Sequence, residues 1–295
     1  MKNLSIKHLT KVYNNGVKAV DNLSLEIHPG MFGLLGPNGA GKSTLMRTIA
    51  TLQSPDTGSL HFHDIDILQD PMALRKILGY LPQEFGVYPK VSAERLLEYF
   101  ARLKGVASKK DRQQLIQRVL EVTNLYEVRK KHVSSYSGGM KQRFGIAQML
   151  LSNPKLIIVD EPTAGLDPAE RQRFLNILRE IGTEHTVLFS THIVDDVKEL
   201  CHEMAIMNGG RVLQQTTPEA ATSALQGQLW TKAIAREDLE QSRTTYNVLS
   251  SHFKRDNSLY IRVYSPERPG PDFTLSDPNL EDAYFLALQS SSTTH

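Results

Sequence analysis

Alternating apolar and polar residues near the start of the chain predict β-strands. The apolar positions of this alternation are Leu4, Ile6, Leu23, Leu25 and Ile27. Such a pattern is typical of strands with one buried face. A turn at 28–30 is followed by a short apolar run at 31–35. This run fits a buried strand of a parallel sheet, and it ends directly in a glycine-rich loop.

Farther along the chain, apolar residues recur at helical spacing. The stretches with this spacing run from Ser43 to about Thr51, over 91–104, over 111–125 and from about Gly138 to Leu151. Apolar runs at 156–159 and 187–190 predict two more buried strands. Because strands and helices alternate, we expect an α/β fold in which helices cover both faces of a parallel sheet.

The last quarter of the chain differs in character. A junction at 216–218 separates it from the rest, and we expect one large domain over 1–220 and an accessory region over 221–295. Its strand-like pieces lie at 229–234 and 258–263, and a final helix starts at about Asn279. This mixture predicts a small α+β unit. Its small core is expected to contain Trp230, Phe273 and Phe285.

The composition is that of an ordinary globular protein, with 40% hydrophobic and 22% charged residues among 295. A net charge of +2 without a basic run argues against a nucleic-acid partner. The single cysteine, Cys201, has no intrachain disulfide partner, which fits a reducing compartment. We expect neither a signal peptide nor a membrane-spanning segment, so any membrane role must come through a partner.

The loop after the strand at 31–35 matches the spacing G-x-x-x-x-G-K-[ST] in full. Its residues are Gly36, Pro37, Asn38, Gly39, Ala40, Gly41, Lys42, Ser43 and Thr44. Between a strand and a helix, such a loop turns its backbone N–H groups around phosphate oxygens. We expect Lys42 to reach the β- and γ-phosphates and the Ser43 hydroxyl to ligate Mg²⁺. A glycine-rich turn without a ligand is the alternative reading.

Two carboxylates follow the apolar run at 156–159. In nucleotide-hydrolysing enzymes with a phosphate loop, the carboxylate that ligates Mg²⁺ occupies this place, so Asp160 is assigned to the metal. Glu161 is then placed to polarise an attacking water. A simple charge pair at the end of a strand is the alternative.

A second device that seeks phosphate lies about a hundred residues after the first. Ser137, Gly138 and Gly139 open their own predicted helix, and alone they would be read as a helix N-cap. Together with the loop and the acidic pair, however, they are similar to the ATP-binding subunits of ABC transporters. The resemblance covers about residues 1–220 and is to the ATPases of multidrug and other ABC-2-type exporters. Tyr136 and Met140 depart from the commonest signature, which has leucine and glutamine there.

Four more positions match this family. Tyr13 resembles the aromatic residue that stacks on adenine, although alone it would be assigned to surface packing. Gln83 resembles the glutamine that contacts Mg²⁺ and water, and Asp167 resembles the loop that crosses the dimer interface. His192 resembles the switch histidine, which holds the γ-phosphate and orients Glu161, whereas a lone histidine at a strand end is usually structural.

The resemblance implies a parallel-sheet core, an N-terminal antiparallel β subdomain and a helical subdomain over about 84–150. It also implies ATP and Mg²⁺ as cofactors, and hydrolysis of ATP by in-line water attack. The signature would serve the ATP of a second ABC ATPase subunit, identical or different. Membrane permease subunits would dock near 83–89 and the helical subdomain and hold the chain at the cytoplasmic face of the membrane. Phe85, Val87 and Tyr88 are apolar residues there that could form the docking surface or could equally belong to the core.

Other readings stay open at this point. A non-transport ABC ATPase in a soluble assembly complex is the main alternative, and a nucleotide-binding regulatory module without catalysis is another. The segment 280–288 resembles the ending common in ABC-2-type exporter ATPases, which favours a transporter. His61 and His63, near two aspartates, suggest a metal cluster, but two polar residues on one exposed strand face explain them better.

Overall fold

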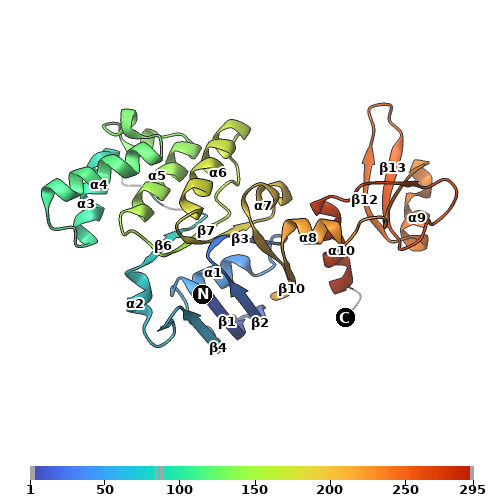
Figure 1. Ribbon diagram of the computed structural model, residues 1–295, viewed down its shortest axis with the longest axis horizontal. Helices are drawn as coiled ribbons and strands as arrows, with labels where there is room; N and C mark the ends of the chain where they lie inside the picture. The colour runs from blue at the N-terminus through green and yellow to red at the C-terminus, as the bar shows by residue number, and fades with distance from the viewer. Residues whose placement is uncertain (1–3, 84–85, 87–89, 293–295) are drawn as a thin grey trace. The chain divides into compact units, whose positions relative to one another are not determined.

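The computed structural model describes residues 4–83, 86 and 90–292, with side chains as far as residue 290. It separates into two compact units, Met1–Val212 and Leu213–His295 (Figure 1). Among the described residues, no helix combines the length and the apolar character that crossing a membrane requires.

An antiparallel sheet begins the first unit. Its strands are β1 (Leu4–Val12), β2 (Lys18–Ile27), β4 (Thr57–Phe62) and β5 (Ile65–Asp66), in the order β2-β1-β4-β5. The predicted alternation is confirmed, because Leu4 and Ile6 of β1 pair with Ile27 and Leu25 of β2, and all four are buried. Period-two patterning has therefore set both the register and the face that enters the core.

The two histidines near this sheet do not share a strand face, so that part of the prediction is wrong. His61 lies in β4, and its Nε2 lies 3.6 Å from a carboxylate oxygen of Asp66. His63 lies beyond the end of the strand with a φ of 55°, and its ring stacks on Phe62. The left-handed backbone at His63 ends the alternation that the prediction assumed.

A second, largely parallel sheet forms the centre of the unit. Its strands are β3 (Gly30–Leu35), β6 (Leu78–Leu81), β7 (Leu156–Asp160), β8 (Thr186–Thr191), β9 (Glu203–Asn208) and β10 (Arg211–Thr216), in the order β10-β9-β3-β8-β7-β6. β3 and β7 both pair with β8 in parallel, with Leu35 opposite Thr191 and Asp160 opposite Ser190. The carboxyl ends of these three strands thus reach one edge of the sheet, where ligands bind in open α/β sheets.

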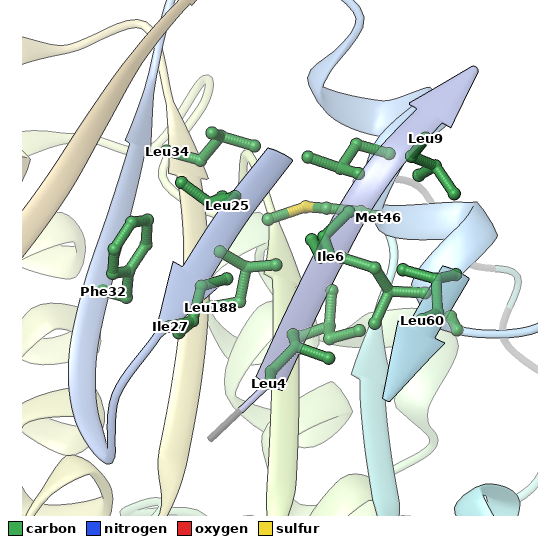
Figure 2. Packing of buried hydrophobic residues seen from close by; sticks show 14 of the residues in the cluster. Leu4, Ile6, Leu9, Leu25, Ile27, Phe32, Leu34, Met46, Leu60 and Leu188 are labelled. Atoms are coloured by element: carbon green, nitrogen blue, oxygen red, sulfur yellow. The ribbon is translucent and has the colours of Figure 1, made fainter. Parts of the chain in front are cut away.

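The main hydrophobic core lies where the two sheets face α1 (Lys42–Ile49). Figure 2 shows how side chains from both sheets and from this helix interlock. The labelled members are Leu4, Ile6, Leu9, Leu25, Ile27, Phe32, Leu34, Met46, Leu60 and Leu188. Full burial of each such side chain contributes roughly 1.5–3 kcal/mol. The helix that follows the glycine-rich loop is therefore anchored from both sides.

Helices enclose the parallel sheet, and three of them pack together with their own core. These three are α3 (Ala93–Leu103), α4 (Lys109–Val122) and α5 (Gly138–Leu150). The remaining helices of the unit are α2 (Pro71–Arg75), α6 (Pro168–Gly182) and α7 (Val194–Leu200), and 3₁₀ turns lie at Tyr126–Val128 and Val133–Ser135. The expected α/β fold with an antiparallel β subdomain and a helical subdomain is confirmed. The predicted helices differ from the observed ones by a few residues at their ends.

The second unit is a small α+β structure, as expected. Its sheet has the order β12-β13-β11-β14 and consists of β11 (Leu229–Ile234), β12 (Val248–Phe253), β13 (Leu259–Tyr264) and β14 (Thr274–Leu275). Its helices are α8 (Pro218–Ser223), α9 (Leu239–Thr245) and α10 (Leu280–Ser292), with a 3₁₀ turn at Arg236–Asp238. Phe273 is central to its core and Trp230 packs against it. Phe285 is instead half-buried beside Tyr284.

Candidate active site

The glycine-rich loop connects β3 to α1, and its glycines are required by the geometry. Gly39 and Gly41 have φ angles of 83° and 100°, which favour glycine. A Cβ at Gly41 would also overlap the carbonyl of Ala19, and a Cβ at Gly36 would overlap that of Met207. The loop therefore forms a close-packed cradle before the N-terminus of α1, the kind of place that binds phosphate.

Lys42 is the first residue of α1, and its ammonium group turns back into the loop. Its Nζ donates to the carbonyl of Gly36 at 2.7 Å and to that of Pro37 at 3.0 Å. It also lies 3.0 Å from Oε1 of Glu161. An ammonium group has three N–H donors, so these three acceptors match it in full. The side chain is only 3% exposed, which places a compact positive charge inside the cradle.

Asp160, the last residue of β7, is buried among hydroxyl groups. Its Oδ1 accepts a hydrogen bond from Ser190 at 2.7 Å and one from Ser43 at 3.2 Å. Carboxylate and hydroxyl oxygens are ligands that suit Mg²⁺, which usually takes few protein ligands and keeps water and phosphate as the others. Burial and the negative charge of Asp160 raise the pKa of the nearby Tyr80 hydroxyl.

Glu161 follows directly and connects Lys42 to His192. While Oε1 contacts Lys42, Oε2 lies 3.2 Å from Nδ1 of His192, the residue that follows β8. The backbone of Glu161 has a φ of 44°, which is uncommon for a residue with a side chain. Its N–H donates to the hydroxyl of Ser190 at 3.0 Å, so that one hydroxyl positions both acidic residues.

A cavity of about 700 Å³ opens beside these groups. Its lining consists of Val17, Lys18, Ala19, Asn38, Gly39, Ala40, Gly41, Lys42, Ser43, Thr44, Gln83, Glu161 and Gly209. Gln83 thus faces the same space as the loop. Phe85, Val87 and Tyr88, the apolar residues of the expected docking segment, lie outside the described residues.

Tyr13 lies beside the loop without lining this cavity. Its hydroxyl is 3.1 Å from the Thr44 hydroxyl and donates to Oε1 of Gln53 at 3.2 Å. The residue as a whole is 37% exposed. A half-open aromatic ring fixed at its hydroxyl end offers a face on which a planar base can stack.

The second phosphate-seeking device is not brought to this cavity. Ser137 caps α5, and its hydroxyl accepts from the N–H of Met140 at 3.2 Å. Ser137, Gly138 and Gly139 are absent from the lining of the cavity that holds Lys42. Asp167 likewise serves as the N-cap of α6, where its carboxylate accepts from the N–H of Glu170 at 2.9 Å. At both helix starts, therefore, the cap side chain accepts the N–H of the third helical residue, and neither cap faces the cavity of Lys42.

Several polar residues around the site were missed by the sequence reasoning. The most buried is Asp196 in α7, which accepts from Thr163, Thr191 and Arg171. A signal was present, because Val194, Val197 and Leu200 mark one apolar side of a helix on which an acidic residue also falls. An acidic residue on the buried side of a helix indicates a pairing partner from elsewhere in the chain.

Comparison with known proteins identifies relatives of this chain that cover the residues of the site. The sequence model of the ABC transporter family matches residues 20–164. The uncharacterized ABC transporter ATP-binding protein YxlF of Bacillus subtilis is 40% identical over 210 residues, covering 71% of this chain and 69% of that protein. The Nod factor export ATP-binding protein I of Cupriavidus metallidurans is 31% identical over 292 residues, 95% of each chain. The methionine import ATP-binding protein MetN 2 of Bacillus anthracis is 31% identical, covering 90% of this chain and 80% of that protein.

Solved structures show the same likeness in three dimensions. CbiO1 of Clostridium perfringens, part of the ABC transporter complex cbiONQ, has a TM-score of 0.69 and 26% identity, with 76% of this chain and 92% of that chain covered. A dimeric ATP-binding cassette in a post-hydrolysis state, bound to ADP and Pi, has a TM-score of 0.66 and 26% identity. That match covers 72% of this chain and 98% of the other.

Proposed function

This chain belongs to the ATP-binding proteins of ABC transporters and is an ATPase of that family, and from this premise we propose that it powers an exporter. Proteins of this family dimerise and associate with membrane permease components. In our proposal two such subunits enclose two ATP molecules, and the cycle of closing and opening drives a separate permease. The chain would then work at the cytoplasmic face of the membrane, held there by the permease.

The residues at the cradle fit ATP with Mg²⁺. The backbone path of the loop requires glycine at 36 and 41, where a Cβ would overlap neighbouring backbone, and favours it at 39, where φ is 83°. Lys42 brings a buried positive charge to this loop. Ser43 and Asp160 present neighbouring oxygen ligands for the metal, with Gln83 facing the same cavity. Mg²⁺, when bound, neutralises negative charge that develops on the phosphates.

The chemistry assigned to the chain is positioning and proton handling. Glu161 is the carboxylate that polarises the attacking water, because it lies at the cavity wall between the cradle and His192. His192 contacts Oε2 of Glu161, the carboxylate oxygen that does not face Lys42, and is placed to contact the γ-phosphate. The single observation that carries the proposed ATP hydrolysis is that Glu161 contacts Lys42 with one carboxylate oxygen and His192 with the other.

Substitution of Lys42 tests the ATPase part of the proposal. In Lys42→Ala the cradle loses its positive charge, so we expect ATP binding and phosphate release to fall together. Lys110→Ala removes an exposed lysine from α4 and serves as the matched control. Wild-type turnover in Lys42→Ala would refute the proposed site.

Partner and direction are tested in the membrane. Support for export comes from the Nod factor export relative, whose match spans 95% of both chains, against 80% of the import relative. The segment 280–288 also resembles the ending common in ABC-2-type exporter ATPases, which supports export. Affinity purification from membranes should bring along a multi-helix permease. Recovery of soluble partners alone would favour the alternative, an ATPase of a soluble assembly complex.

Inside-out membrane vesicles give the direction of transport. With ATP added outside, an exporter accumulates its substrate in the vesicle lumen, and an importer empties it. Untargeted metabolite analysis of the lumen, with wild type compared with Glu161→Gln, therefore distinguishes the two for a substrate of any chemical class. Depletion of lumenal compounds would contradict export.

A further inference from the structure

Asp196 is a fully buried carboxylate that the chemistry above does not use. It accepts hydrogen bonds from the hydroxyls of Thr163 at 2.7 Å and Thr191 at 3.3 Å, and from Nε of Arg171 at 2.7 Å. A carboxylate is tolerated away from water only when it is paired and hydrogen-bonded. Asp196 therefore fixes three separate segments, one of which carries Glu161 two residues before Thr163.

The second of these segments carries His192. The Thr191 hydroxyl donates to Asp196 and accepts from the backbone N–H of Ile193 at 2.9 Å. One hydroxyl thus spans the backbone on both sides of His192. Asp196 therefore accepts a hydrogen bond from the same hydroxyl that bridges the backbone around His192.

The third segment is the start of α6, where two adjacent residues make contacts to opposite neighbours. Arg171 pairs with Asp196, whereas Oε2 of Glu170 lies 3.2 Å from Nη2 of Arg143 in α5. Arg143 is buried and also donates to two carbonyls at the end of α4. A Cβ at Gly139 would overlap the Glu170 carboxylate, so the signature end of α5 is packed against α6 itself (Figure 1).

On the basis of the proposed function, we propose that the first turn of α6 links the chain's own ATP site to the signature that serves the second subunit's ATP. Asp196 and Arg171 connect the segments of Glu161 and His192 to α6, and Glu170 and Arg143 connect α6 to the helix that Ser137 caps. Asp196 acts as a positioning residue in this link. ATP binding at the chain's own cradle thereby changes the position of the signature helix.

The link is tested with the purified full chain by hydrogen exchange and by steady-state kinetics with ATP and Mg²⁺. In wild type, ATP should slow exchange at 36–44 and also change it at 137–143. In Arg171→Gln the change at 36–44 should persist, and the change at 137–143 should disappear. We also expect kcat to fall by about tenfold or more, because small misplacements of catalytic groups are costly. KM should stay within about twofold, since an interaction of the transition state is lost rather than binding.

Two further variants test the contacts individually. Arg171→Lys keeps the positive charge and should restore part of kcat and of the exchange change. Glu170→Gln breaks the other pair and should reproduce the Arg171→Gln result. Arg171→Gln leaves the buried Asp196 without its charged partner, and Glu170→Gln does the same to the buried Arg143, so thermal unfolding of each variant is measured as well. Arg171→Lys keeps the charge beside Asp196 and is the variant expected to keep the unit folded.

The matched control is Arg179→Gln. Arg179 pairs with Glu199 at 3.1 Å and thus joins the same two helices, α6 and α7, away from the site. Equal losses in Arg179→Gln and Arg171→Gln would overturn the link, as would an unchanged kcat or a persisting change at 137–143 in Arg171→Gln. A wild type that fails to hydrolyse ATP, or that matches Glu161→Gln in turnover, would instead refute the proposed function.

Discussion

Nζ of Lys42 lies 3.0 Å from Oε1 of Glu161, and both side chains are buried. The two residues come from different sequence motifs, 119 positions apart by number (161 − 42 = 119). The same carboxylate reaches His192 with its other oxygen. One acidic side chain therefore contacts both Lys42 in the cradle and His192, the residue after β8.

Replacement of this acidic side chain should separate hydrolysis from binding. In Glu161→Gln we expect phosphate release to fall by about 10²–10⁴-fold, because the amide cannot accept a proton from water. ATP binding should persist or tighten, since Lys42 keeps its two carbonyl contacts and loses only the competing carboxylate. Phosphate-release assays and fluorescent-nucleotide titration measure the two effects. Glu180→Gln, an exposed change in α6, is the control, and equal turnover in both variants would contradict the assignment.

The two signature glycines should respond differently to substitution. A Cβ at Gly138 meets no atom within 4 Å, and aspartate suits the first turn of a helix, so Gly138→Asp should leave the fold intact. Its negative charge would repel phosphate, so hydrolysis should fall while ATP still binds. Gly139→Ala should instead lower thermal stability, because its Cβ would overlap the Glu170 carboxylate. Full hydrolysis by Gly138→Asp would argue against a signature that contacts ATP.

Glu98 gives a pH-dependent contribution to the stability of the helical subdomain. Burial raises the pKa of Glu98, but the hydrogen bonds from Arg112 and Arg102 lower it by more than burial raises it. The pKa of Glu98 therefore lies below its usual value of 4.5. Because the folded pKa is depressed, the stabilisation is complete above pH 4.5 and is lost as the pH falls through the folded value. Glu98→Gln should therefore lower the free energy of unfolding by about 1 kcal/mol at pH 7. The difference between wild type and Glu98→Gln in urea titrations should shrink toward zero in acid; a constant difference would contradict this origin.

The second unit depends on an ion pair between β13 and α10. Nε of Arg262 lies 2.5 Å from Oδ1 of Asp282, whose side chain is only 2% exposed. Asp282→Ala leaves the arginine without its partner, so we expect a loss of about 3–5 kcal/mol. Trp230 is the only tryptophan, so its fluorescence in urea reports the unfolding of this unit. Glu240→Ala, at an exposed pair with Arg243, should change stability by less than about 1 kcal/mol. Similar losses in both variants would contradict the prediction.

Residues that act through local sequence could be predicted well. The glycine-rich loop is defined by its own backbone, and the positions of Asp160 and Glu161 follow from the end of a buried strand. Parallel pairing then brings both to the loop, because β7 and β3 flank the same strand. Ser137 as an N-cap is also local, and the structure places it there.

Residues that act through pairing between distant segments could not be predicted. The sequence marks Asp196 as an acidic residue on the buried side of a helix, but its partners Thr163 and Arg171 are known only after folding. Arg143 likewise meets Glu170 only once α6 lies against α5. Hydrophobic periodicity identifies which face of a helix is buried, but it carries no information on which polar groups meet there. The prediction that His63 shares a strand face with His61 was wrong for a related reason. A single residue in the left-handed conformation, His63 itself, ends the alternation that the pattern would have continued.

The left-handed backbone of Glu161 has an evolutionary consequence. A glycine or asparagine at position 161 would adopt the φ of 44° with less strain, yet neither could place a carboxylate between Lys42 and His192. Stability and activity therefore make opposite demands on this position. Under the proposed role of Glu161, a chain that no longer needs to hydrolyse ATP is free to replace it with one of those residues, whereas a chain that hydrolyses ATP keeps the glutamate despite its backbone strain.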